Sequence, residues 1–235
     1  MIIRILLLLG SLNTLLASEK ISYFKPPEKW QDADHTKLSP SVKMAYYKQI
    51  NALANASINI AVEKIDDIKL SEYLKVVKKI HSDNRSNSWR NLGKFNTKAG
   101  KAQLTEITTK NKVGVMKMLQ LILVHEGYAY VMTGATQKKH FPTLRNTFVQ
   151  TFRTLTLTDD LIGEIGEIAK EETLKEYLLK TKKLCSNIDA ISEEKKKAIL
   201  DFHSHVTTNY EEMGAYWQYL IIKELFDSVT SNEIK

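Results

Sequence analysis

The sequence is poor in the residues on which several kinds of functional site depend. Its 235 residues include one cysteine, Cys185, together with nine glycines and four prolines. A single cysteine excludes an intramolecular disulfide and any metal site built from cysteines. The common phosphate-binding loops G-x-x-x-x-G-K-[ST] and G-x-G-x-x-G are absent, as is the G-x-S-x-G motif of serine hydrolases. We therefore expect no cofactor and no metal ion.

The histidines also form no recognisable catalytic or metal-binding motif. His203 and His205 are two residues apart in a predicted helix, so their side chains point to different sides of it. His125 has only Glu126 beside it, and two ligands do not make a metal site. We expect a protein that is not an enzyme, and the competing hypothesis is an enzyme with an unrecognised site.

The first 18 residues have the pattern of a secretory signal peptide. Arg4 precedes an apolar run that begins at Ile5 and ends with the small residues Ala17 and Ser18. The run is shorter than the roughly 20 residues that a membrane-spanning helix needs. The pattern predicts cleavage after residue 18, no transmembrane span in the mature chain, and export to the periplasm or the medium. The alternative is an uncleaved N-terminal anchor.

Charge is distributed unevenly along the chain. Residues 22–157 contain 22 Lys and Arg against 10 Asp and Glu, whereas residues 158–235 contain 10 against 16. This change of sign predicts a boundary near residue 158, between a basic body at 22–157 and an acidic C-terminal part at 158–235. The two parts could also attract each other.

The basic body has the periodicities of a sheet with two helices. Alternating apolar residues at 41–48 and 57–64 predict strands, and apolar residues at three- and four-residue spacing predict a helix at 71–82. Further strands are expected at 88–97, 101–110, 113–124 and 128–136. Pro142 suits the first turn of a helix that follows the last strand.

The acidic part is predicted to be helical. Asp159 and Asp160 suit the start of a first helix, and Ser192 is a good N-cap for a second, long helix. That second helix carries an aromatic stripe that includes Tyr210 and Trp217. We expect a helical hairpin that docks either on the body or on a partner.

The order of elements resembles the PsbP/Mog1-like family of small α/β/α sandwiches, which includes exported bacterial domains of unknown function. The resemblance rests on PPEKW at 26–30, SINIAVEK at 57–64, the helix near 71–82, the segment 116–136 and FPTLRNTFVQTFRTLTL at 141–157. It covers residues 22–157 and implies an α+β fold, an antiparallel sheet sandwiched by helices. It implies no common chemistry, because fold alone does not determine function.

Two surfaces are candidates for contact with a partner. One is the cluster Lys138, Lys139 and His140 with Arg145 one turn into the next helix, and the other is the aromatic stripe with Tyr210 and Trp217. A basic surface attracts anionic partners. The leading hypothesis is a non-catalytic binding or assembly module of the bacterial envelope that contacts a protein, with a weak polyanion contact possible and no nucleic acid expected. The alternative is a secreted factor that binds a host protein or a polyanion.

Overall fold

The structure is a computed structural model that describes residues 19–34, 37–52, 54–65, 68–111, 114–186 and 192–230. The predicted signal peptide, residues 1–18, lies outside the described residues. Within the described part, no helix combines the length and the apolar character that crossing a membrane requires.

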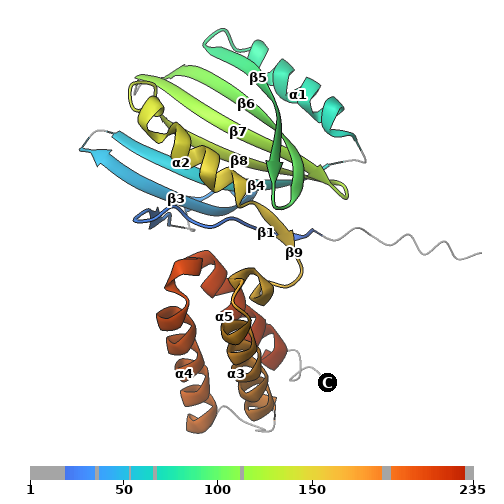
Figure 1. Ribbon diagram of the computed structural model, residues 1–235, viewed down its shortest axis with the longest axis vertical. Coiled ribbons are helices and arrows are strands. Elements are labelled where there is room, and N and C mark those ends of the chain that lie inside the picture. Colours follow the sequence, from blue (N-terminus) through green and yellow to red (C-terminus); the bar gives the residue numbers. More distant parts are fainter. Residues whose placement is uncertain are drawn as a thin grey trace, which may run out of the picture.

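The centre of the fold is an antiparallel sheet of seven strands in the order β2-β3-β4-β8-β7-β6-β5 (Figure 1). The strands are β2 (Gln31–Asp32), β3 (Val42–Asn51), β4 (Ala54–Lys64), β5 (Asn87–Thr97), β6 (Gly100–Asn111), β7 (Gly114–His125) and β8 (Tyr128–Gln137). The predicted strands are thus all present, and the long central strand at 113–124 lies inside the sheet as β7. Most neighbouring strands in the sheet are also consecutive in the chain. The exception is the central pair β4 and β8, which is separated in sequence by α1 and β5–β7.

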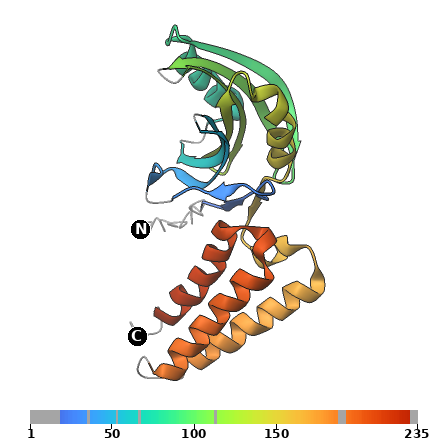
Figure 2. The same ribbon diagram turned by 90° about the vertical axis from the view of Figure 1, so that its left-hand side faces the viewer.

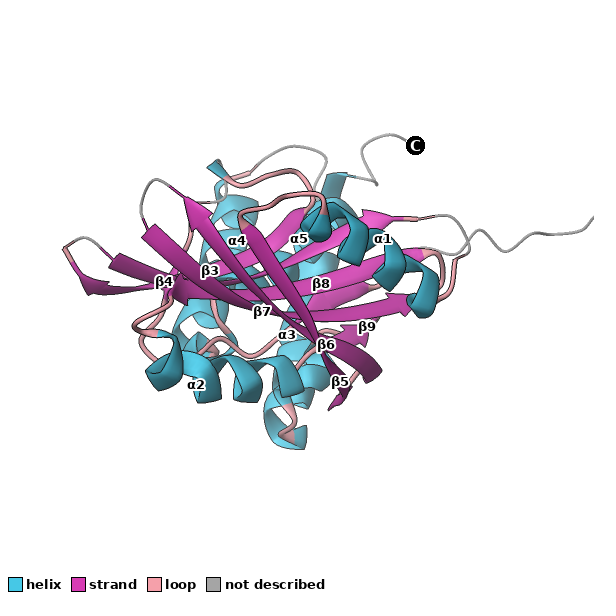
Figure 3. Ribbon diagram, turned by 90° about the horizontal axis from the view of Figure 1, so that it is seen from above, coloured by secondary structure: helices cyan, strands magenta, loops and turns pink. Residues whose placement is uncertain are grey.

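Two helices cover the two faces of the sheet (Figure 3). On one face, α1 (Leu70–Ser82) buries Tyr73 against Ile122 and Ala129. On the other, α2 (Phe141–Arg153) buries Phe148 and Phe152 in the main core. The approach of α2 is so close that a Cβ at Gly134 of β8 would lie 2.5 Å from the Phe148 ring. The predicted fold class, an antiparallel sheet sandwiched by helices, is confirmed.

The C-terminal part is helical, but it contains three α-helices rather than the predicted hairpin. They are α3 (Ile168–Ser186), α4 (Glu193–Asn209) and α5 (Ala215–Thr230), with short 3-10 turns η2 (Ile162–Ile165) and η3 (Glu211–Met213). Ser192 caps α4 as predicted, its hydroxyl accepting a hydrogen bond from the Lys195 amide at 3.2 Å. The prediction of one long second helix was wrong. Helix α4 ends at Asn209, where the C-cap Tyr210 has φ −132° and ψ 37°, and Gly214, with φ +81° and ψ 157°, separates η3 from α5.

The helical part lies beyond the β2–β3 side of the sheet (Figures 1 and 2). The chain reaches it through β9 (Thr156–Thr158), which pairs with β1 (Ile21–Tyr23) in a small second sheet. A single cluster of buried apolar residues continues from the sheet into the helices; it includes Tyr23, Phe24 and Tyr46 on one side and Tyr210, Met213 and Trp217 on the other. The last strand ends at Thr158 and helical elements follow it, and the cluster of buried apolar residues continues across this point.

Candidate binding surfaces

The predicted basic loop lies where β8 ends and α2 begins. Lys138, Lys139 and Arg145 are exposed, and His140 is half-buried as the residue before the first turn of α2. The Lys138 amide donates a hydrogen bond to the Val115 carbonyl of β7 at 2.8 Å. This hydrogen bond joins the loop to the start of β7, and Lys138 and Lys139 are exposed beside it.

Two further cations, which sequence reasoning missed, belong to the same end of the sheet. Arg90 of β5 and Lys117 of β7 both bind the carboxylate of Glu106 on β6, at 2.8 and 3.0 Å. Lys117 also lies 4.8 Å from the centre of the Phe141 ring at the start of α2. Because the three strands are adjacent, their register brings together residues that are far apart in the sequence.

We call this set the basic surface: Lys138, Lys139, His140, Arg145, Arg90 and Lys117. The carboxylate of Glu106, which pairs with Arg90 and Lys117 of this set, is only 11% exposed. The side chain of Arg90 is 66% exposed, so it can bind a second anion at the surface. The arrangement has the properties of a contact site for negatively charged groups.

The aromatic stripe of the C-terminal helices, in contrast, lies inside the protein. Tyr210 and Trp217 are 2% and 0% exposed. The Trp217 indole donates a hydrogen bond to the Leu161 carbonyl at 2.8 Å, and Tyr210 donates one to the Lys170 carbonyl at 3.0 Å. Both residues were predicted to meet a partner, but in the structure their partners are other parts of the same chain. The reason is that three helices surround the stripe, whereas a hairpin would have left one side of it open.

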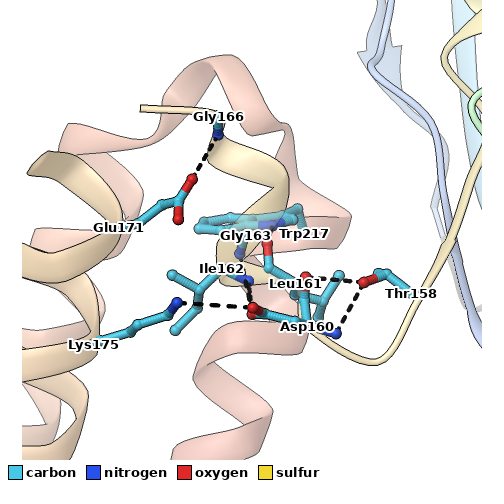
Figure 4. A network of polar contacts seen from close by, with 9 residues as sticks. All are labelled: Thr158, Asp160, Leu161, Ile162, Gly163, Gly166, Glu171, Lys175 and Trp217. Atoms are coloured by element: carbon cyan, nitrogen blue, oxygen red, sulfur yellow. Dashed lines mark hydrogen bonds and ion pairs between the residues drawn. The ribbon is translucent and has the colours of Figure 1, made fainter. Parts of the chain in front are cut away.

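Figure 4 shows the residues around the hydrogen bond between Trp217 and Leu161. Asp160 accepts hydrogen bonds from the amides of Ile162 and Gly163, each at 3.1 Å, and so starts η2 directly after β9. That turn brings the Leu161 carbonyl to the Trp217 indole. Asp160 thus precedes a 3-10 turn, whereas the sequence predicted that it starts the first α-helix of the acidic part.

A cleft of about 850 Å³ lies between the proline-rich segment 25–30, here called the lead-in, and the turn from α4 to α5. Its lining is mixed: Lys25, Pro26, Pro27, Glu28, Lys29, Trp30, Asp32, Tyr46, Thr207, Glu211, Glu212, Gly214, Ala215 and Gln218. Lys29 has φ +61°, an uncommon conformation for a residue with a side chain, and Trp30 packs edge-on against Phe148. The cleft contains carboxylates of both parts of the chain, and its described lining includes no histidine or cysteine.

Burial alters the pKa values of several ionisable groups. Burial lowers the pKa of His205, whose ring packs between Tyr177 and Tyr210 at centroid distances of 4.7 and 5.9 Å. Burial likewise raises the pKa of Cys185, which is 1% exposed, and so keeps its thiol protonated. In the described part of the chain, no three His, Cys, Asp or Glu residues are grouped so that they could hold a metal ion.

Comparison with known proteins finds likeness in structure only. No family model matches the sequence, and no curated protein is significantly similar to it. Among solved structures, the chain is similar to the cyanobacterial PsbP protein CyanoP of Synechocystis sp. PCC 6803, with 14% identity, a TM-score of 0.41, and coverage of 64% of this chain and 99% of that one.

Two further structures are similar to a comparable degree. LpqN of Mycobacterium tuberculosis, described as involved in cell envelope biogenesis, has 11% identity and a TM-score of 0.45 over 59% of this chain and 86% of that one. The Ran-binding protein Mog1p of Saccharomyces cerevisiae has 15% identity and a TM-score of 0.39 over 57% of this chain and 88% of that one. Proteins of the PsbP and Mog1 type are thus found among the matches, as the sequence resemblance predicted, and at these identities the likeness concerns the fold alone.

Proposed function

We propose that this protein is an exported, non-catalytic binding or assembly module of the bacterial envelope, which contacts an anionic region of a protein partner through the basic surface. The observation that carries the proposal is that Arg90 of β5 and Lys117 of β7 share one nearly buried carboxylate, Glu106, while Lys138 and Lys139 are exposed in the loop between β8 and α2. Glu106 offsets only part of that charge, so the surface as a whole stays positive.

The non-catalytic part of the proposal is supported by the chemistry of the described hollows. The cleft beside the lead-in is lined by no histidine or cysteine, and a smaller one of about 260 Å³ between α3 and α4 contains a single histidine, His205. General acid–base catalysis needs a titrating group within reach of a reacting atom, usually supported by a second one. An enzyme remains the alternative if a substrate is found for the Glu and Asp residues of the larger cleft.

We propose export because residues 1–18 have the pattern of a signal peptide. We propose a boundary at residue 158 because the charge and the type of secondary structure change there. Mass spectrometry of the protein recovered from cell fractions tests the first point. A mature N-terminus near residue 19 in the periplasm would agree with an envelope module. Recovery from the medium would instead favour a secreted factor that binds a host protein or a polyanion, and an intact Met1 would contradict cleavage.

The binding site is tested by charge reversal with a matched control. The test variant carries Lys138→Glu and Lys139→Glu. The control variant carries Lys75→Glu and Lys78→Glu on α1, which covers the opposite face of the sheet, and it changes the net charge by the same amount. Binding to immobilised heparin and to poly-L-glutamate is measured over a range of salt concentrations. We expect the first variant to lose most of the binding and the second to retain it. An equal loss in both variants would show that only the overall charge matters, and would contradict a defined site.

A further inference from the structure

The two edges of the seven-stranded sheet differ in length and in protection. The β2 edge is two residues long, and the helical part of the chain lies on that side (Figure 1). The other edge is β5, with eleven residues, which pairs with β6 and with no further strand in the described part of the chain. A long edge strand presents backbone donors and acceptors with which another extended chain can pair.

A β-bulge divides β5 into two regular segments. The register shifts between Asn91 and Gly93, so that residues 87–91 and Gly93–Thr97 each pair regularly with β6. Beyond Thr97 the backbone amides at this edge already have partners within the chain. The amides of Lys98 and Ala99 donate hydrogen bonds to the carbonyls of Arg153 and Leu155 at 3.1 and 2.8 Å. We call residues 93–97 the edge segment.

A hollow of about 630 Å³ adjoins the edge segment. Among the described residues it is lined by Lys94, Phe95, Asn96, Thr97, Lys98 and Arg153, which include three cations and no carboxylate. Phe95 packs partly against the main core and is only half-buried, so it offers an apolar contact at the edge of the sheet. The edge segment thus combines backbone groups, one aromatic contact and positive charge.

We infer that the edge segment is a second interaction site, which binds an extended acidic peptide segment of a partner by strand addition. Backbone hydrogen bonds to an added strand give affinity, and the side chains beside it give selectivity. The cations Lys94, Lys98 and Arg153 select carboxylates on the added strand, since opposite charges on neighbouring strands stabilise the pair. A second copy of this chain is a poor occupant, because pairing two edge segments would bring these like charges together.

Strand addition differs from simple charge attraction in what it requires of the peptide backbone. Two fluorescein-labelled decapeptides are compared by fluorescence anisotropy, one of alternating Glu and Val and one of alternating Glu and Pro. Proline has no amide hydrogen and cannot complete a strand ladder, although the charge of the two peptides is the same. We expect the Glu–Val peptide to bind at least tenfold more tightly and to slow amide hydrogen exchange in the edge segment. Equal binding of both peptides, binding of neither, or unchanged exchange at residues 93–97 would overturn the inference.

Variants separate this site from the basic surface. Lys94→Glu with Lys98→Glu should weaken binding of the Glu–Val peptide by tenfold or more. The charge-matched control carries two replacements on the neighbouring strand β6. They are Lys101→Glu, opposite Asn96, and Lys110→Glu, near the C-terminal end of β6, and together they should weaken binding much less. Lys138→Glu with Lys139→Glu should leave hydrogen-exchange protection of the edge segment in place, so failure of one site is distinguishable from failure of the other. An equal loss of binding in the edge variant and its β6 control would overturn the inference.

Discussion

The indole N–H of Trp217 donates a hydrogen bond to the main-chain carbonyl of Leu161 at 2.8 Å, and the Trp217 side chain is fully buried. The bond joins the last helix to the turn that follows β9. It satisfies two polar groups that are both away from water, and such groups are costly when left unpaired.

Replacement of Trp217 should therefore destabilise the whole chain. We expect Trp217→Ala to lower the free energy of unfolding by about 3–5 kcal/mol through loss of buried contacts. Trp217→Phe should cost about 1–3 kcal/mol, because it leaves the Leu161 carbonyl unpaired. Urea unfolding followed by circular dichroism measures both. Tyr219→Ala, at a residue 56% exposed on the same helix, is the control and should have a small effect.

If Trp217→Ala instead melted the helices and left the sheet intact, two separate transitions would appear. That outcome would mean that the core shared between sheet and helices contributes little to cooperativity, and that residue 158 separates two independently stable units.

Gly214 is expected to be intolerant of any side chain, for two reasons. Its φ of +81° and ψ of 157° lie in a region that is almost confined to glycine, and a Cβ there would lie 2.7 Å from the Tyr46 hydroxyl and 2.8 Å from Cγ of Pro26. We expect Gly214→Ala to lower the free energy of unfolding by about 1–3 kcal/mol or more from crowding and backbone strain together. Thermal unfolding provides the measurement.

Gly166→Ala is the matched comparison for that experiment. Gly166 also has a positive φ, +72°, but no atom lies within 4 Å of the position of its Cβ. Its replacement should cost about 1 kcal/mol, from backbone conformation alone. Equal losses in the two variants would show that contact with Tyr46 and Pro26 is unimportant.

Stability should fall as the solution becomes acidic, in part because of His205. Its Nδ1 is 3.0 Å from the Asn209 side-chain amide, its ring packs on Tyr177 and Tyr210, and Lys170 lines the same hollow. Burial lowers the pKa of His205 in the folded state, so below about pH 6.5 the unfolded chain binds more protons than the folded one. Stability is thus fully present above the unfolded pKa and declines as the pH falls towards the folded pKa. His81, whose pKa is also lowered by burial, should contribute in the same direction.

The measurement is the free energy of unfolding in urea at several values between about pH 5 and 8, a range that brackets the ordinary histidine pKa. We expect His205→Gln to flatten the pH dependence relative to the unmodified protein. His203→Gln, on the exposed side of α4, is the matched histidine replacement with which the curve of His205→Gln is compared. A curve for His205→Gln as steep as that of the unmodified protein would contradict the assignment.

Cys185 should act as a reporter of opening between α3 and α4. It is 1% exposed and burial raises the pKa of its thiol, so both access and thiolate formation are suppressed in the folded state. We expect 5,5′-dithiobis(2-nitrobenzoic acid) to react slowly in buffer and rapidly in denaturing urea. Prompt reaction in buffer would show that the helical part opens readily by itself.

The sequence predicted attraction between the charges of the basic body and the acidic part, and the described contact between them is mainly apolar. Lys20 pairs with Asp159 near the junction, whereas Lys170–Glu212 and Lys182–Glu224 join helices within the C-terminal part. The contact is made instead by buried aromatic residues and by hydrogen bonds such as that from the Tyr23 hydroxyl to the Met213 carbonyl at 2.8 Å. Exposed ion pairs contribute little to stability, and apolar burial contributes much more.

Local periodicity by itself determined the strands, α1, α2 and the fold class, because alternation and three- to four-residue spacing are visible within one segment. The cap at Ser192 was predictable for the same reason. Tertiary structure alone decided three features: the break at Gly214, the burial of Tyr210 and Trp217, and the meeting of Arg90, Glu106 and Lys117. At that break a Cβ on residue 214 would lie 2.7 Å from the Tyr46 hydroxyl and 2.8 Å from Cγ of Pro26, which are distant in sequence. The burial of the aromatic stripe depends on packing with a third helix. The meeting of Arg90, Glu106 and Lys117 depends on the register of three adjacent strands. Contacts between distant segments fixed each of these features, and no pattern within a single segment records them.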